Sequence, residues 1–103
     1  MTTVMVRNGE NDLHRIVVIQ GRFMFDTRNE CLKVLELMPE GITRVTIDMT
    51  RTDYLDSAAL GMLIQARQKL AGVELGLKVK SGSPVSQIVE VANFHQIFAY
   101  EAV

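Results

Sequence analysis

The sequence predicts an α/β fold: a mixed β-sheet that opens with a β-hairpin and has about three to four helices packed on it. Two observations lead to this class. Segments with apolar residues at every second position alternate along the chain with segments whose apolar residues recur at helical spacing. The first two strand-like segments are joined across Asn8-Gly9-Glu10-Asn11, and the full order is β-β-α-β-α-β-α-β. That order implies parallel strands with right-handed crossovers after the hairpin.

The first half of the chain begins with the hairpin. Its strands are predicted over residues 4–6 and 14–19, because Asn-Gly between two apolar segments is a strong turn signal. A helix follows, for which Thr27 and Glu30 stand at capping-box spacing. Its apolar stripe is Cys31, Leu32, Leu35 and Met38. Pro39 and Gly41 are expected to end it.

The second half alternates strands and helices. A strand over 45–49 with one buried face is expected to lead, through a connection over 50–55, into a helix from about Ser57 to Leu70. A strand over 75–79 follows, and Ser83-Pro84 has the residue types of an N-cap and first helical position. A short strand over 97–100 is expected to close the chain.

Size, charge and composition restrict the function. The 103 residues predict a single domain over 1–103, large enough to fold without disulfides or metal. The net charge is −1 and the basic residues are scattered, which argues against nucleic-acid binding. Residues 16–19 form the longest continuous apolar run near the N-terminus, too short for a signal peptide or spanning helix, so a cytoplasmic protein is expected. Cys31 is predicted to be a core residue, and neither His14 nor His95 has neighbouring metal ligands, so no metal or cofactor is expected.

Asp56-Ser57 is the most informative pair of residues. It lies between the strand through Ile47 and the start of the next helix, so Ser57 is a candidate phosphorylation switch. The first backbone N–H groups of a helix lack internal partners and would favour an added phosphate. Asp and Ser are also preferred N-caps, so either residue could instead serve only to cap the helix.

The stretch 45–49, the six-residue connection and Asp56-Ser57-Ala58-Ala59-Leu60-Gly61 together resemble the STAS domain, the family of bacterial anti-sigma factor antagonists. The resemblance extends over essentially the whole chain. Gly21-Arg22-Phe23 matches the segment after the family's second strand, and 92–98 lies where the family has a short apolar segment. Ala58 and Ala59 differ from the usual Ser or Thr and Gly, and Met24 stands where an aspartate is common, with Asp26 two residues later.

The resemblance implies a partner switch. Ser57 would be phosphorylated by an anti-sigma type serine kinase and dephosphorylated by a PP2C-like phosphatase. The unphosphorylated form would bind the kinase or anti-sigma factor, and the phosphorylated form would release it. The residues expected to contact the partner are Met24, Asp26, Asp56, Ala58, Leu60 and Gly61.

Two other classes of function compete with this one. STAS domains also resemble docking subunits of transport complexes, which would keep the fold and change the assembly. An enzyme is less favoured, because the chain has no nucleophile elbow and no P-loop. Asp48, Asp53 and Asp56 could in principle bind Mg²⁺ with a phosphate, although acidic loops at strand ends are common without a metal.

Overall fold

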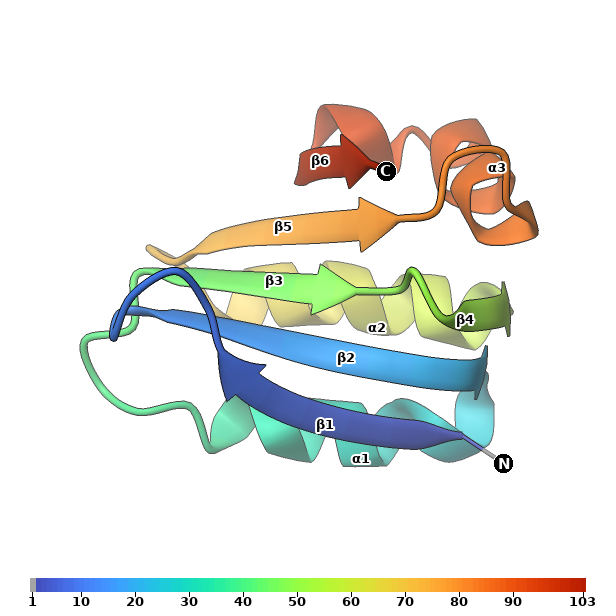
Figure 1. The fold of residues 1–103 in the computed structure, drawn as a ribbon. Helices are drawn as coiled ribbons and strands as arrows, with labels where there is room; N and C mark the ends of the chain where they lie inside the picture. The colour runs from blue at the N-terminus through green and yellow to red at the C-terminus, as the bar shows by residue number, and fades with distance from the viewer. Residues whose placement is uncertain (1) are drawn as a thin grey trace.

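The structure, a computed structural model, describes residues 2–103 and contains a six-stranded mixed sheet with three α-helices and one 3₁₀ helix. Figure 1 shows the arrangement. The elements in chain order are β1 (Thr3–Asn8), β2 (His14–Phe23), α1 (Phe25–Glu36), β3 (Arg44–Asp48), β4 (Thr52–Leu55), α2 (Ser57–Lys69), β5 (Glu74–Val79), α3 (Pro84–Val91), the 3₁₀ helix Phe94–Gln96 and β6 (Ala99–Ala102).

The sheet has the strand order β1-β2-β3-β5-β6, and β4 pairs with the end of β2. Among the strands that the structure describes, only the hairpin partners β1 and β2 run antiparallel, and the other pairings are parallel. Both α1 and α2 lie on the same face of the sheet, whereas α3 lies beside β4 near the carboxyl ends of β3 and β5 (Figure 1). The predicted α/β class with an opening hairpin is therefore confirmed.

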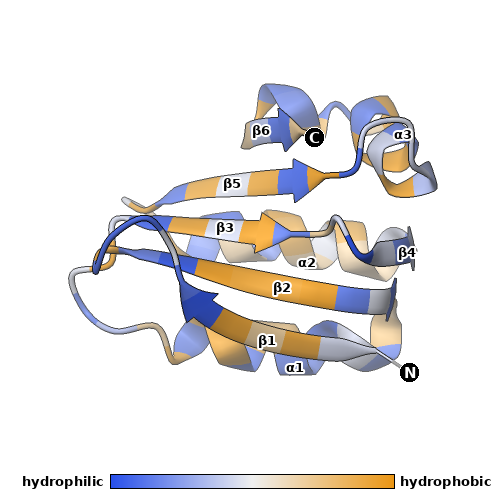
Figure 2. Ribbon diagram, in the orientation of Figure 1, coloured by the Kyte–Doolittle hydropathy of each residue, from blue (hydrophilic) through white to orange (hydrophobic). Residues whose placement is uncertain are grey.

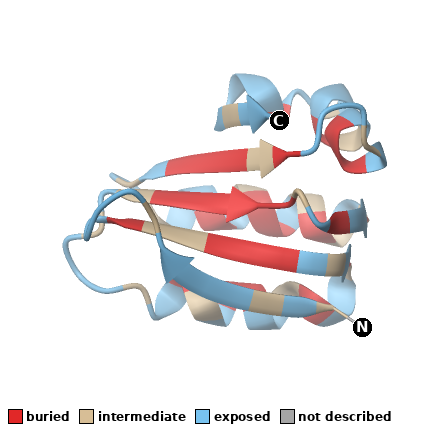
Figure 3. Cartoon of the chain, viewed as in Figure 1, coloured by how far each residue is buried: buried red, intermediate tan, exposed pale blue. Residues whose placement is uncertain are grey.

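The core lies between the sheet and the two helices α1 and α2. The central strands are apolar in their middle parts (Figure 2), and the same parts are buried (Figure 3). Val17, Ile19 and Ile47 of the sheet are fully buried against Met62 and Leu63 of α2 in one cluster. Cys31 belongs to this cluster, as predicted, and burial raises the pKa of its thiol to about 12.

The first helix begins earlier than the sequence predicts. Its N-cap is Met24, and Thr27 is the third helical residue rather than the cap. The Thr27 hydroxyl donates to the Met24 carbonyl and also accepts from the Met24 N–H, at 2.9 and 3.1 Å. The expected Thr27–Glu30 capping box is therefore wrong, because Thr27 lies inside the first turn and its hydroxyl bonds the backbone groups of the N-cap residue Met24. Of the predicted stripe, Cys31, Leu32 and Leu35 are buried as expected, whereas Met38 is half-buried and lies beyond the end of the helix at Glu36.

The predicted connection over 50–55 is also wrong in part, because it contains strand β4. This strand pairs with β2 beyond a register shift at Gly21, whose φ of 99° is a conformation that glycine adopts readily. The final strand is displaced as well: residues 94–96 form the 3₁₀ helix, and β6 covers 99–102. By contrast, α2 and the Ser83 N-cap of α3 are confirmed, the latter by a 3.1 Å bond from the Ser86 N–H.

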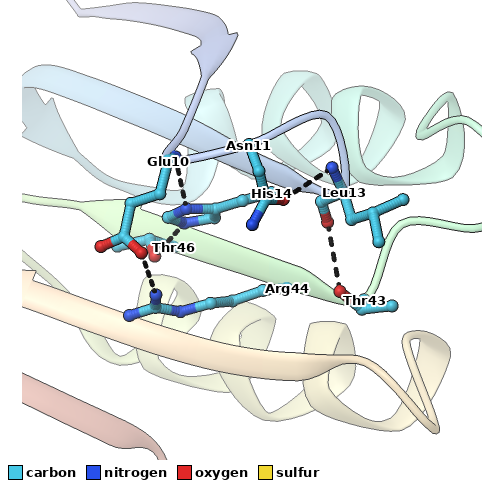
Figure 4. A network of polar contacts seen from close by, with 7 residues as sticks. All are labelled: Glu10, Asn11, Leu13, His14, Thr43, Arg44 and Thr46. Atoms are coloured by element: carbon cyan, nitrogen blue, oxygen red, sulfur yellow. Dashed lines mark hydrogen bonds and ion pairs between the residues drawn. The ribbon is translucent and has the colours of Figure 1, made fainter.

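His14 fastens the hairpin turn to β3. Its side chain lies on the sheet face opposite Val17 and Ile19, since neighbouring residues of a strand alternate between faces. Nδ1 accepts a hydrogen bond from the Glu10 N–H at 3.1 Å, so the ring proton is on Nε2 and donates to the Thr46 hydroxyl at 2.8 Å (Figure 4). Burial, and then the Arg44 guanidinium, lower the pKa of His14. The ring is therefore neutral in this arrangement.

Candidate functional site: the start of the second helix

Asp56, not Ser57, caps α2. The Asp56 carboxylate accepts from the Ala59 N–H at 2.9 Å, and Ser57 is the first helical residue. The side chain of Ser57 is exposed to solvent. The sequence left open which of the two residues caps the helix. The structure assigns the cap to Asp56, so the Ser57 hydroxyl is not needed for it.

Asp56 also connects α2 to α1. Its second carboxylate oxygen accepts a 3.2 Å hydrogen bond from the N–H of Phe25, which is the first helical residue of α1. The Asp56 N–H donates to the Phe23 carbonyl at 3.3 Å. One carboxylate therefore bridges the N-termini of two helices, which begin side by side at the same end of the sheet (Figure 1). The positive ends of both helix dipoles point towards this region.

The residues predicted to contact a partner all lie on or next to this surface. Asp26 and Gly61 are exposed, and the others are half-buried: Met24, Asp56, Ala58 and Leu60. Met24 and Asp26 come from the start of α1, and the remaining four from the start of α2. The structure thus brings the two groups together, while their contact with a partner stays a prediction.

Two exposed aromatic residues next to this site were missed in the sequence. Phe25 is 66% exposed and Tyr54 is 42% exposed. Each is accompanied by an arginine: the Arg28 guanidinium lies 5.4 Å from the Phe25 ring centroid, and that of Arg22 lies 6.0 Å from the Tyr54 ring. The signal that could have identified Phe25 is a large apolar residue between Met24 and Asp26, outside the buried stripe of its helix.

An apolar groove adjoins Leu60, and Val91 on its rim is 84% exposed. It has a volume of about 450 Å³ and is lined by residues of β4, α2 and α3: Tyr54, Leu60, Pro84, Gln87, Ile88, Val91 and Ala92. We name it the α2–α3 groove. In the sequence, Val91 lies off the apolar stripe of α3, which is the sign that its side chain is not needed for the core.

Gly61 is a glycine inside a helix without a steric reason within the chain. Among the described residues, a Cβ at this position would meet no atom within 4 Å apart from its chain neighbours and the backbone of its own helix, and the backbone has helical geometry. Glycine inside a helix costs about 1 kcal/mol relative to alanine. The residue therefore lowers the stability of α2 and leaves its exposed surface flat beside Leu60.

Metal binding has no support at this end of the sheet. Among residues 2–103, no three His, Cys, Asp or Glu side chains are grouped so that they could hold a metal ion. Asp48 is buried and accepts from both the N–H and the hydroxyl of Thr50, whereas Asp53 is exposed. Across the same residues, none of the helices is both long and apolar enough to cross a membrane.

The STAS domain profile matches residues 5–103, so the chain belongs to the STAS domain family. A STAS-domain containing protein from Pseudomonas aeruginosa (strain UCBPP-PA14) is 34% identical over 83 residues, which are 80% of this chain and 82% of that protein. The family resemblance stated from the sequence is confirmed.

Solved structures share the fold at low identity. An anti-sigma factor antagonist from Mycobacterium paratuberculosis superposes with a TM-score of 0.84 at 15% identity, over 100% of this chain and 87% of that one. A sulfate transporter family protein from Wolinella succinogenes gives 0.75 at 16% identity, over 90% and 80%. The anti-sigma factor antagonist SpoIIAA in its unphosphorylated form gives 0.71 at 11% identity, over 97% and 89%.

Proposed function

We propose that this protein is a regulatory binding module of the anti-sigma factor antagonist type, switched by phosphorylation of Ser57. The observation that carries the proposal is the exposed Ser57 hydroxyl beside Asp56, which alone caps the helix, on the same helix turn as Leu60 of the α2–α3 groove. A kinase can therefore modify Ser57 without breaking the cap. In this proposal the protein has no catalytic activity of its own.

Unmodified, this surface suits a close protein contact. Phe25 and Tyr54 offer aromatic anchors, and Gly61 lets a partner approach the backbone of α2. Aromatic residues and arginine are the types most often found at energetically important positions of interfaces. The proposed partner is a kinase-like anti-sigma regulator, with a PP2C-like phosphatase restoring the binding form.

Phosphorylation would reverse this fit. In the proposed reaction the Ser57 oxygen forms a bond to the γ-phosphorus of ATP, the bond to the bridging oxygen of ADP breaks, and the hydroxyl proton passes to a base of the kinase. The phosphate adds about −1.5 to −2 charges at neutral pH. A partner that covers Leu60 would then have to desolvate this charge, which is costly unless the charge is paired.

The test is phosphorylation by a purified serine kinase of the anti-sigma type. We expect that kinase to label the wild-type protein and Ser81→Ala, whose substituted serine lies in an exposed loop before α3, but not Ser57→Ala. Phosphopeptide mapping from cells should find the phosphate on Ser57. Phosphate found only at other positions would refute the switch, and stable copurification with a transport permease would instead favour a docking subunit.

A further inference from the structure

The second oxygen of the Asp56 carboxylate is not explained by capping. An N-cap needs one acceptor for its own helix, and Asp56 supplies that to Ala59 at 2.9 Å. The other oxygen is used for a different helix, through the Phe25 N–H at 3.2 Å. Asn or Ser would cap α2 equally well but could not accept at both places with the same geometry. The carboxylate is the residue type that this bridge requires.

The two bonds differ in strength. The bond to Ala59 is the shorter and lies within one helix turn, whereas the bond to Phe25 joins segments 31 residues apart. A longer N–H···O distance indicates the weaker hydrogen bond. Any competing negative charge near Asp56 should therefore release Phe25 first and leave the cap of α2 in place.

Ser57 is the position from which such a charge would act. It directly follows Asp56, so a phosphate there would add negative charge next to the residue that carries the carboxylate, and like charges repel. The phosphate oxygens would also compete for the unpaired N–H groups at the helix starts. The backbone bond from Asp56 to the Phe23 carbonyl involves no charged group and should persist.

We propose that Asp56 is a positioning residue that transmits the state of Ser57 to the start of α1, releasing the Phe25 N–H when Ser57 is phosphorylated. This inference rests on the proposed function only in taking Ser57 as the modified residue. The release would loosen Phe25, and with it the Arg28 guanidinium stacked on its ring. The switch would then change the aromatic anchor on α1 as well as the charge on α2.

The test uses nuclear magnetic resonance of the purified full-length protein, with phosphoserine built in at position 57 during synthesis. In the unmodified protein, the amide protons of Phe25 and Ala59 should both follow the acid titration of the Asp56 carboxyl. With phosphoserine at 57, the Phe25 amide should cease to follow it and should exchange with solvent about tenfold faster, while the Ala59 amide should still follow it. Phosphoserine at 81 is the matched control and should leave both amides unchanged.

Asp56→Asn provides the second measurement, with Asp53→Asn on β4 as its control. Asparagine can keep the bond to Ala59 but turns its amide group towards Phe25, so the Phe25 amide should exchange faster, and phosphoserine at 57 should add nothing further. A Phe25 amide that still follows the Asp56 titration in the phosphoserine protein overturns the relay, whatever the variants do. Neither kinase nor partner is needed, so this result is independent of whether Ser57 is labelled in cells.

Discussion

At the scale of one residue, Gly61 is less favourable for the stability of α2 than an alanine would be. It lies in the second turn of α2, is exposed, and has open space where a side chain would be. We expect Gly61→Ala to raise the free energy of unfolding by about 1 kcal/mol, the difference between the two residues in a helix. Urea unfolding measures this change.

The same substitution should weaken partner binding, because the added methyl group holds the partner away from the α2 backbone. Gln68→Ala, also exposed on α2, is the control and should change neither quantity strongly. If Gly61→Ala stabilises the protein and binds the partner as well as the wild type does, Gly61 is not part of the interface.

Asp56 and Ser57 are adjacent, yet they should differ widely in their contributions to stability. Asp56→Ala removes an acceptor from two helix starts and should cost roughly 1–2 kcal/mol, whereas Ser57→Ala should change stability by less than about 0.5 kcal/mol. Ser83→Ala removes the single capping bond of α3 and should lie between them, at about 1 kcal/mol. Thermal and urea unfolding of the three variants check this order. A Ser57→Ala protein less stable than Asp56→Ala would contradict the assignment of the cap.

At the scale of elements, the β1–β2 hairpin should be sensitive to acid through His14. Burial of the ring and the charge of Arg44 disfavour its protonation, whereas Glu10 and Glu74 favour it. The net effect lowers the pKa of His14 below the ordinary 6.5. The unfolded chain therefore takes up this proton at a higher pH than the folded protein does. The contribution of neutral His14 to the free energy of unfolding should be fully present above pH 6.5. It should be lost progressively as the pH falls from there towards the lower pKa of His14 in the folded protein.

The physical cause is the Nδ1 atom, which accepts from the Glu10 N–H and cannot do so once it carries a proton. Urea unfolding at a series of pH values should show the loss in the wild type and in His95→Gln, and a flatter profile in His14→Gln. An unchanged profile in His14→Gln would show that other groups cause it. Gly9 should tolerate no larger residue, since a Cβ there would lie 2.1 Å from the ring nitrogen Nδ1.

The elements that the sequence predicted are those with local signals. Asn8-Gly9 predicts the hairpin, whose connection spans residues 9–13 after Asn8 ends β1, and Ser83-Pro84 predicts the start of α3. Strand β4 had no such signal, because its pairing depends on the change of register in β2 at Gly21, a contact between segments far apart in the chain. The start of α1 was missed for a related reason: Met24 is not a capping residue type, and Asp56 supplies an acceptor to this helix from a distance.

The candidate site was predictable to a similar degree. The Asp-Ser pair and the start of the following helix are continuous in sequence, so Ser57, Leu60 and Gly61 could be placed together. The α2–α3 groove could not be predicted, because Tyr54 and Val91 meet only in the folded protein. Whether these residues bind a partner depends on a second molecule and stays a prediction.

At the scale of the whole molecule, the parallel topology determines where the proposed phosphorylation site lies. Both α1 and α2 follow strands that end at the same edge of the sheet, so their positive N-terminal ends lie together (Figure 1). The α2–α3 groove lies at this end too, since α3 contacts β4. A charge added to Ser57 therefore acts on a surface to which three helices contribute.

We expect Ser57→Glu to bind the kinase-like partner at least about tenfold more weakly than the wild type, a difference of about 1.4 kcal/mol. A carboxylate has less charge and fewer acceptor oxygens than a phosphate, so the phosphorylated protein should bind more weakly still. Ser57→Ala should bind like the unmodified protein, and Ser81→Glu, with its added charge in the exposed loop before α3, should also bind normally. Calorimetry of these proteins gives the order of affinities. A partner that presents an arginine to position 57 would reverse it, and tighter binding by Ser57→Glu than by Ser57→Ala would then make phosphorylation the signal for binding instead of release.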